Sequence, residues 1–162
     1  IKSLKSNNGI YLVPAFTGLG APYWAVNARG ILSGLTRDTG PKEIVRATVE
    51  SVAYQTHDLF EAMKNDGLKP KIIKVDGGMV KNNWFSQFLA DVVDIKVLRP
   101  KVDETTALGA AFMAGLQIGV YKSLKDIAKN WQADKSFKPK IKNPDRKILI
   151  DGWDKAIKKT LS

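Results

Sequence analysis

The residues best suited to ligand chemistry are Asp76-Gly77-Gly78, followed shortly by Asn82. The apolar pair Ile72-Ile73 precedes them and an amphipathic run begins at Trp84, which predicts a strand, a tight glycine turn and a helix. Adjacent glycines allow positive φ and let a ligand approach the backbone, and a helix N-terminus offers unpaired N–H donors. The pattern favours a nucleotide at the end of a strand, although an ordinary strand–helix connection also uses glycine to turn and aspartate to cap.

The standard phosphate and nucleophile motifs are missing from the chain. No Gly-x-x-x-x-Gly-Lys-Ser/Thr loop occurs, and Gly18-Leu19-Gly20 lacks the third glycine of the dinucleotide fingerprint. Without cysteine there is no thiolate nucleophile or zinc–thiolate site, and a single histidine, His57, excludes a multi-histidine metal site. His57 and Asp58 share one predicted helix, which favours a surface or interhelix histidine over a catalytic pair. We therefore expect no catalytic or metal-ligating residue here.

Length and composition indicate a folded domain. The 162 residues are 44% apolar, which suits one compact unit with its own core. The apolar runs are far shorter than the roughly 20 residues that span a bilayer, and the N-terminus lacks a signal-peptide core, so we expect a cytoplasmic protein that does not bind membranes. Because the chain begins with Ile1 instead of Met, we expect a piece of a longer protein.

The net charge of +10 comes from 26 Lys and Arg against 16 Asp and Glu. Such an excess attracts nucleic acids, acidic membranes or anionic small molecules. The basic residues gather late, between Lys135 and Lys159, without the spacing of a helix-turn-helix or a zinc finger. This placement favours a solvated basic surface, and we expect no nucleic-acid partner.

Hydrophobic periodicity predicts alternating strands and helices. That order is typical of an α/β fold with a mainly parallel sheet flanked by helices, where ligands collect at the carboxyl ends of the strands. The expected strands lie at 10–13, 72–73 and 95–98, the expected helices at 41–66, 82–92, 104–116, 124–131 and 152–161, and a lysine-rich surface loop at 135–147.

Two segments allow more than one interpretation. The helix at 104–116 contains Gly109 and Gly115, and each glycine inside a helix costs roughly 1 kcal/mol relative to alanine, so a packing reason is needed. That reason is either close helix packing inside one domain or a contact across a moving interdomain cleft. In the loop at 14–24, we expect Phe16, Tyr23 and Trp24 to pin the chain against a neighbouring layer, in a structural role more than a ligand-binding one.

Motifs in a fixed order connect these segments to a known family. The loop at 16–24 reads Phe-Thr-Gly-Leu-Gly-Ala-Pro-Tyr-Trp, and the other motifs lie at 28–30, 46–56, 75–78, 82–83 and 104–111. Together they resemble the FGGY family of carbohydrate kinases, with its actin-like, ribonuclease-H-like ATPase fold, and the loop resembles the glycerol-specific branch. The resemblance covers nearly the whole chain and implies that residues 1–162 are one C-terminal, nucleotide-side half-domain.

The resemblance implies transfer of the γ-phosphate of ATP to glycerol, giving sn-glycerol 3-phosphate, with Mg²⁺ bound to the nucleotide. Gly78 and Asn82 match family positions that contact the nucleotide, Met79 would line the adenine, and Gly77 makes the turn possible, with Asp76 in a structural role. The phosphate loops, general base, glycerol-binding residues and metal ligands of the family lie upstream of this segment. The resemblance therefore implies that this chain alone is inactive and works with a separate N-terminal lobe in a homo-oligomeric enzyme.

The residues leave three alternatives open. One is another sugar or polyol kinase of the family, such as a xylulokinase-like enzyme. A second is a non-catalytic actin-like ATP-binding module, since no catalytic base is in view. The third, a nucleic-acid binder, depends on charge alone.

Overall fold

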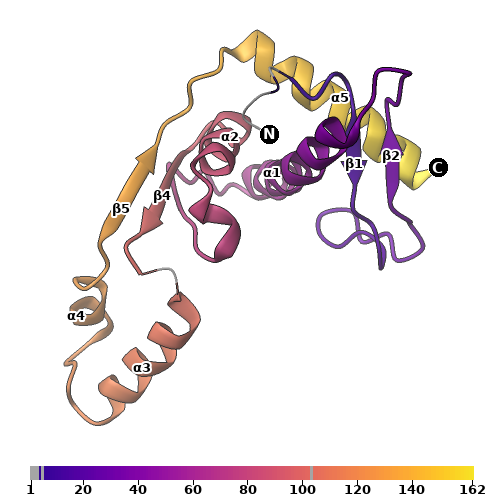
Figure 1. The fold of residues 1–162 in the computed structure, drawn as a ribbon. Coiled ribbons are helices and arrows are strands. Elements are labelled where there is room, and N and C mark those ends of the chain that lie inside the picture. Colours follow the sequence, from indigo (N-terminus) through magenta and orange to yellow (C-terminus); the bar gives the residue numbers. More distant parts are fainter. Residues whose placement is uncertain (1–3, 5, 103) are drawn as a thin grey trace.

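A computed structural model describes Leu4 and residues 6–102 and 104–162 of the chain. An antiparallel pair of short strands, β1 (Tyr11–Val13) and β2 (Ile31–Ser33), packs beside the long helix α1 (Pro41–Asn65) and the C-terminal helix α5 (Asn143–Leu161) (Figure 1). Helix α1 begins as expected, because its first residue is a proline and the Glu43 carboxylate accepts a hydrogen bond from the Gly40 N–H at 2.9 Å.

Aromatic side chains form the centre of the core. Trp153 on α5 is 0% exposed and Tyr54 on α1 is 1% exposed, and their rings stack with centroids 5.3 Å apart. Phe88 on helix α2 (Asn83–Val93) meets Tyr54 edge to face at 5.6 Å. The core therefore joins helices α1, α2 and α5 to strand β1. We call these four elements the body.

The second sheet has the order β3 (Ile72–Lys74), β4 (Lys96–Pro100) and β5 (Ala133–Phe137). Strands β3 and β4 are parallel, as the β–α–β order predicts, whereas β4 and β5 are antiparallel. The α/β class is thus confirmed, but the sheet is mixed instead of mainly parallel. The returning strand β5 follows a helical excursion and then leads directly into α5 along the top of Figure 1.

The excursion between β4 and β5 forms an arm, residues 104–132, which carries helices α3 (Thr105–Gln117) and α4 (Leu124–Ala128). Figure 1 shows the arm extending away from α1 and α5. Gly115 is the buried residue of α3, and α4 has none among the described residues. A Cβ built on Gly109 would have no atom within 4 Å, so the described residues do not supply the close packing that its glycine suggested.

Three local predictions are wrong. The segment 135–147 is not a loop, because β5 ends within it and α5 starts at Asn143. The sequence of β5 does not show the alternation of apolar and polar residues that is typical of a half-buried strand. Four of its five residues are exposed, and only Phe137 is buried. The helix expected at 124–131 ends at Ala128. In the aromatic loop, Phe16 and Trp24 are each 75% exposed, and Tyr23 alone makes the expected anchor.

Across the described residues, no helix combines the length and the apolar character needed to cross a membrane.

Candidate functional site

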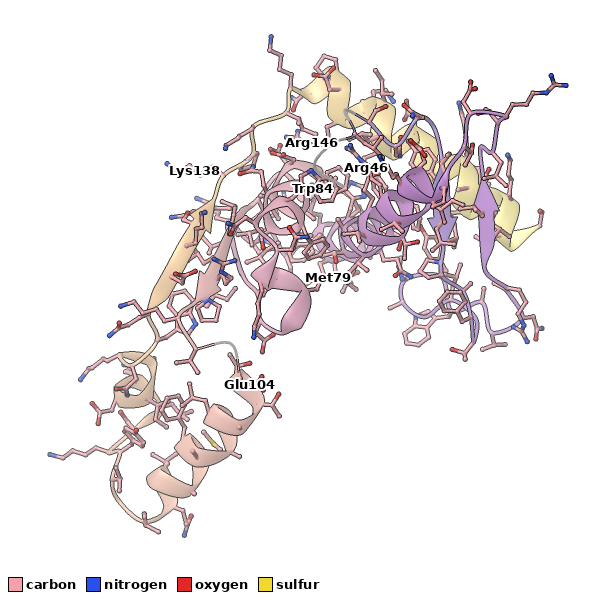
Figure 2. All side chains as sticks on the ribbon, viewed as in Figure 1. Arg46, Met79, Trp84, Glu104, Lys138 and Arg146 are labelled. Carbon is pink, nitrogen blue, oxygen red and sulfur yellow. The ribbon has the colours of Figure 1, made fainter. Side chains whose placement is uncertain are left out.

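The segment 75–83 lies between β3 and α2, at the carboxyl end of a strand that pairs in parallel with β4. The Val75 N–H donates to the Leu98 carbonyl at 3.0 Å and so extends the pairing beyond β3. Asp76, Gly77 and Gly78 are exposed, and Met79 is 45% exposed on the short 3₁₀ helix η1 (Gly78–Lys81) (Figure 2). The sequence thus located a strand-end loop correctly, and all four predicted binding residues lie on it.

The two glycines of the loop differ in backbone conformation. Gly77 has φ +90°, a conformation that side chains rarely adopt, so the turn itself requires glycine. Gly78 does not have positive φ, and a Cβ built on it would have no atom within 4 Å. Neither backbone strain nor a contact within the described part of this chain therefore requires a glycine at position 78.

Asn82 forms the N-cap of helix α2. Its Oδ1 accepts a hydrogen bond from the Trp84 N–H at 2.9 Å, and its backbone N–H donates to the Met79 carbonyl at 3.1 Å. Helix η1 stands between Gly77 and α2. Gly78 is therefore the first residue of η1, and the start of η1 has no side-chain cap. The helix expected at 82–92 is thus confirmed as α2, whereas η1 was not expected.

Sequence reasoning missed Arg99, which lies on β4 just beyond the strand expected at 95–98. Its Nη1 donates to the Val80 carbonyl at 2.9 Å, to the Lys81 carbonyl at 3.1 Å and to Asn83 Oδ1 at 3.1 Å. The available signal was a charged side chain in a partly buried strand, because such a group needs acceptors. The identity of those acceptors could not be deduced from local sequence.

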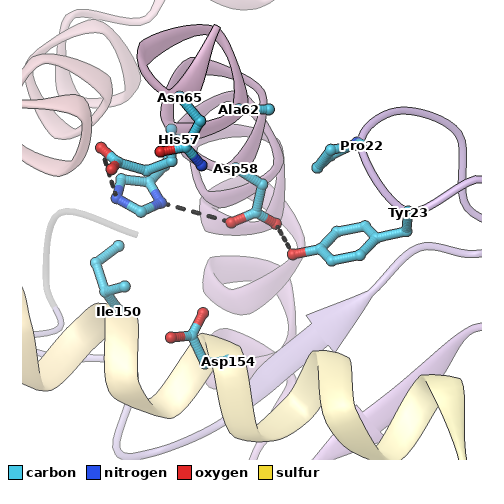
Figure 3. A pocket seen from close by; sticks show the side chains of 9 residues that line it. Pro22, Tyr23, His57, Asp58, Ala62, Asn65, Ile150 and Asp154 are labelled. Atoms are coloured by element: carbon cyan, nitrogen blue, oxygen red, sulfur yellow. Dashed lines mark hydrogen bonds and ion pairs between the residues drawn. The ribbon is translucent and has the colours of Figure 1, made fainter.

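A cavity of about 580 Å³ lies apart from this loop, between α1 and α5 (Figure 3). At its edge the buried Asp58 carboxylate accepts hydrogen bonds from the Tyr23 hydroxyl at 2.8 Å and from Trp153 Nε1 at 2.7 Å. Burial and the neighbouring Asp58 both raise the pKa of Tyr23, so its hydroxyl remains a donor. His57 Nδ1 is 3.5 Å from Asp58 Oδ1.

This arrangement agrees with the expected interhelix histidine. Asp58 already serves two donors that connect α1 to the aromatic loop and to α5, which gives it a structural role. Within the described ranges, no group of three or more histidine, cysteine, aspartate or glutamate side chains is arranged to hold a metal ion.

Solved structures of other proteins resemble nearly the whole chain. The glycerol kinase of Plasmodium falciparum, solved with ADP, superposes with a TM-score of 0.87 at 35% identity, covering 99% of this chain and 32% of that one. A ligand-bound xylulose kinase from Lactobacillus acidophilus superposes with a TM-score of 0.76 at 27% identity, covering 94% and 31%. Both similarities agree with the actin-like, ribonuclease-H-like fold expected from the sequence.

Sequence comparison gives the same family. Glycerol kinase 1 of Pseudomonas aeruginosa is 55% identical over 156 residues, which is 96% of this chain and 32% of that protein. The glycerol kinase of Ectopseudomonas mendocina is 56% identical over 155 residues, covering 95% and 31%. The chain thus spans about a third of the length of these relatives. A family model for the C-terminal domain of FGGY carbohydrate kinases matches residues 2–118, and the chain belongs to this family.

Proposed function

We propose that residues 1–162 form the C-terminal, nucleotide-side lobe of a glycerol kinase, which transfers the γ-phosphate of ATP to glycerol. The observation that carries the proposal is the likeness of 99% of the chain to a glycerol kinase that was solved with ADP. Its TM-score of 0.87 exceeds the values of 0.75 and 0.76 for the gluconate kinase and the xylulose kinase from Lactobacillus acidophilus. This ranking favours glycerol over the sugar substrates of other branches.

We place the adenosine end of ATP against Gly77, Gly78, Met79 and Asn82. The open space over Gly78 supports this placement, because it lets a flat ring lie directly on the backbone. Met79 offers exposed, polarizable surface for the purine. Asn82 uses its Oδ1 to cap α2, and among the described residues none accepts a hydrogen bond from its Nδ2, which is therefore available to the nucleotide.

The rest of the proposed kinase must supply the remaining chemistry. Phosphoryl transfer depends on positioning and on neutralising charge at the phosphates. The described residues have no carboxylate cluster suited to Mg²⁺, so the metal would be held by the ATP phosphates and by other parts of the enzyme. A catalytic base and glycerol-binding groups are likewise expected there. The cytoplasmic location and the homo-oligomeric state remain predictions.

The substrate is tested in the full-length kinase that contains this chain. ATP consumption should be fastest with glycerol and much slower with xylulose or gluconate at equal concentrations. Faster consumption with either sugar would replace the glycerol assignment with another branch of the family. Nucleotide binding without transfer to any polyol would support the alternative of a non-catalytic ATP-binding module. Residues 1–162 alone should show no transfer.

The nucleotide site is tested by Gly78→Val in the same full-length protein. A valine side chain would occupy the space proposed for the nucleotide without straining φ, so the KM for ATP should rise by about tenfold or more while the fold persists. Gly20→Val is a matched control, because Gly20 also lacks positive φ and a Cβ there would meet no atom within 4 Å. Equal ATP affinity in the wild type and in a folded Gly78→Val protein would remove the site assignment.

The two functions of Asn82 can be separated. Asn82→Asp keeps an oxygen that caps α2 but removes the Nδ2 donor and adds a negative charge near the nucleotide. Asn82→Ser keeps the cap without the charge. Both variants should weaken ATP binding and retain normal stability, with the larger effect in Asn82→Asp. If ATP binding falls only when α2 is also destabilised, as in Asn82→Ala, then Asn82 acts as a cap alone.

A further inference from the structure

The proposed nucleotide loop is attached at both ends to consecutive residues of β4. At its start, the Val75 N–H donates to the Leu98 carbonyl at 3.0 Å. At its end, Arg99 Nη1 contacts the carbonyls of Val80 and Lys81 at 2.9 and 3.1 Å. Between these two attachments the loop is exposed. The position of its central residues therefore depends on how firmly Arg99 is held.

Asp134 on β5 holds the other side of the same guanidinium. Its Oδ2 accepts from Arg99 Nε at 2.9 Å and from Nη2 at 2.6 Å. The Arg99 side chain is 15% exposed, and its Cζ lies 5.8 Å from the centre of the Phe137 ring, which is also on β5. One arginine thus connects the end of η1 to two residues of a neighbouring strand.

This connection has a physical reason. The last carbonyls of a helical turn have no intrahelical partner and carry partial negative charge, so a cation with several donors stabilises them. Only arginine provides a rigid planar fork that can face the η1 carbonyls with one nitrogen and a carboxylate with the other two. Asp134 fixes the rotation of the fork and so decides where Nη1 points.

We propose that Arg99 and Asp134 are positioning residues of the nucleotide site: Asp134 orients the Arg99 guanidinium, and Arg99 fixes the end of η1 so that Gly78 and Met79 face the nucleotide. The inference rests on the proposed function. It also assigns a role to β5, because Asp134 lies outside residues 2–118, the region that the family model matches.

The chain contains a matched control in Arg146. Its Nε donates to the Asp91 carbonyl at 2.6 Å and its Nη2 to Asp94 Oδ1 at 2.8 Å, and its side chain is 13% exposed. Arg146 therefore resembles Arg99 in burial, in carbonyl contacts and in its carboxylate partner. Arg146 lies on α5, however, and contacts the C-terminal end of α2, whereas Arg99 contacts Asn83 at the N-terminal end of α2.

The first test compares Arg99→Lys with Arg146→Lys in the full-length enzyme. Lysine keeps the charge but loses the fork. For Arg99→Lys we expect the KM for ATP to rise about fivefold to tenfold, with kcat and the KM for glycerol within about twofold. Arg146→Lys should leave all three constants within about twofold. Equal effects on the KM for ATP in the two variants would overturn the inference.

Asp134 offers a milder variant, because its side chain is 47% exposed and its replacement should not prevent folding. Asp134→Asn should raise the KM for ATP by about threefold, and Asp134→Glu should restore part of the loss. A purely structural role would lower stability in Asp134→Asn and leave the KM for ATP unchanged in the remaining folded enzyme.

The second test needs no nucleotide. Amide hydrogen exchange of residues 75–84 should be several-fold faster in Arg99→Lys and Asp134→Asn than in the wild type, and unchanged in Arg146→Lys. If Asp134→Asn exchanges these amide hydrogens at the wild-type rate, the inference is wrong. The proposed function is judged separately by Gly78→Val: if that variant weakens ATP binding while Arg99→Lys does not, the site stands and the positioning role fails.

Discussion

The body and the arm of this chain differ in how they bury their side chains. In the body, Trp153 is 0% exposed and Tyr54 is 1% exposed, and Asp58 joins α1 to α5 through the indole N–H. In the arm, α3 has a single buried residue, Gly115, although the helix contains no charged side chain at all. The body covers its apolar surface with its own residues, whereas the described residues leave most of α3 uncovered.

An uncharged helix is not typical of a surface that faces water. Helices at such surfaces normally carry charged or polar residues on one side, and a helix that is apolar all round is usually covered. The contrast therefore indicates that the sequence of α3 is adapted to a neighbour. Of the two explanations for its small residues, packing within the chain is observed at Gly115, where a Cβ would lie 2.9 Å from the Tyr121 ring, but not at Gly109, where a Cβ would meet no atom within 4 Å. We expect the rest of the proposed kinase to cover α3, as in the interdomain alternative.

Truncating an aromatic side chain should cause a much larger loss of stability in the body than in the arm, and this is the largest difference that we expect between them. Trp153→Ala should lower the free energy of unfolding by about 3–5 kcal/mol or prevent folding, because it opens a cavity and leaves Asp58 with one donor fewer. Phe112→Ala in α3 should cost about 1 kcal/mol or less in residues 1–162, because Phe112 packs mainly edge to face on Tyr121, at 5.5 Å. Chemical unfolding followed by fluorescence measures both.

A control separates the cavity from the hydrogen bond at Trp153. Trp153→Phe keeps most of the ring and removes Nε1, so its cost should be well below that of the alanine variant. Equal losses for Trp153→Ala and Phe112→Ala would contradict the comparison of body and arm. A much larger cost for Phe112→Ala in the full-length enzyme than in residues 1–162 would show that the rest of the enzyme covers the arm.

Two glycine-to-alanine substitutions should have opposite signs. In the body, a Cβ at Gly152 would overlap the ring and hydroxyl of Tyr11, so Gly152→Ala should cost about 1–3 kcal/mol despite its gain in helix propensity. In the arm, a Cβ at Gly109 meets nothing within 4 Å, so Gly109→Ala should stabilise residues 1–162 by up to about 1 kcal/mol. Thermal unfolding of the two variants checks the signs. A loss of stability or activity for Gly109→Ala in the full-length enzyme alone would place another backbone against α3.

Local patterns predicted the parts of the fold that local forces determine. Helix α1 was predicted from the proline at its first position and from the helical spacing of its apolar residues. Both signals can be read from residues that are close together in the sequence. The glycine turn was predicted because glycine tolerates the positive φ that a tight turn requires and that Gly77 adopts. Strand β5 was missed because its strand state comes from pairing with β4, which its own exposed residues do not signal.

In the candidate site too, only the residues that lie close together in the sequence could be predicted. Gly77, Gly78, Met79 and Asn82 are neighbours in sequence, so one motif located them together. Arg99 and Asp134 are separated from this motif and from each other along the chain, and they meet only because β4 lies between β3 and β5. No local pattern encodes that meeting, so the structure was needed to find it.

The smallest difference that we expect between the body and the arm is in the pH dependence of stability, through one carboxylate in each region. On α5, burial and the nearby Asp58 raise the pKa of Asp154 above its ordinary 3.8, while His57 and Lys158 oppose the shift. On α4, hydrogen bonds from Lys129 and from the Lys122 N–H lower the pKa of Asp126 below 3.8. The folded protein therefore binds the Asp154 proton more tightly than the unfolded chain does, and the Asp126 proton less tightly.

The sign of the pH dependence follows from linkage. Because the folded state holds the Asp154 proton more tightly, the wild type should lose stability relative to Asp154→Asn as the pH rises from 3.8 through the raised pKa. For Asp126 the wild type should lose stability relative to Asp126→Asn as the pH falls from 3.8 through the lowered pKa. The free energy of unfolding of both variants and of the wild type, measured across this pH range, tests the two predictions. Parallel pH profiles for Asp154→Asn and the wild type would mean that the carboxylate on α5 is as well hydrated in the folded body as in the unfolded chain, and the burial that distinguishes the body would not extend to this edge of its cavity.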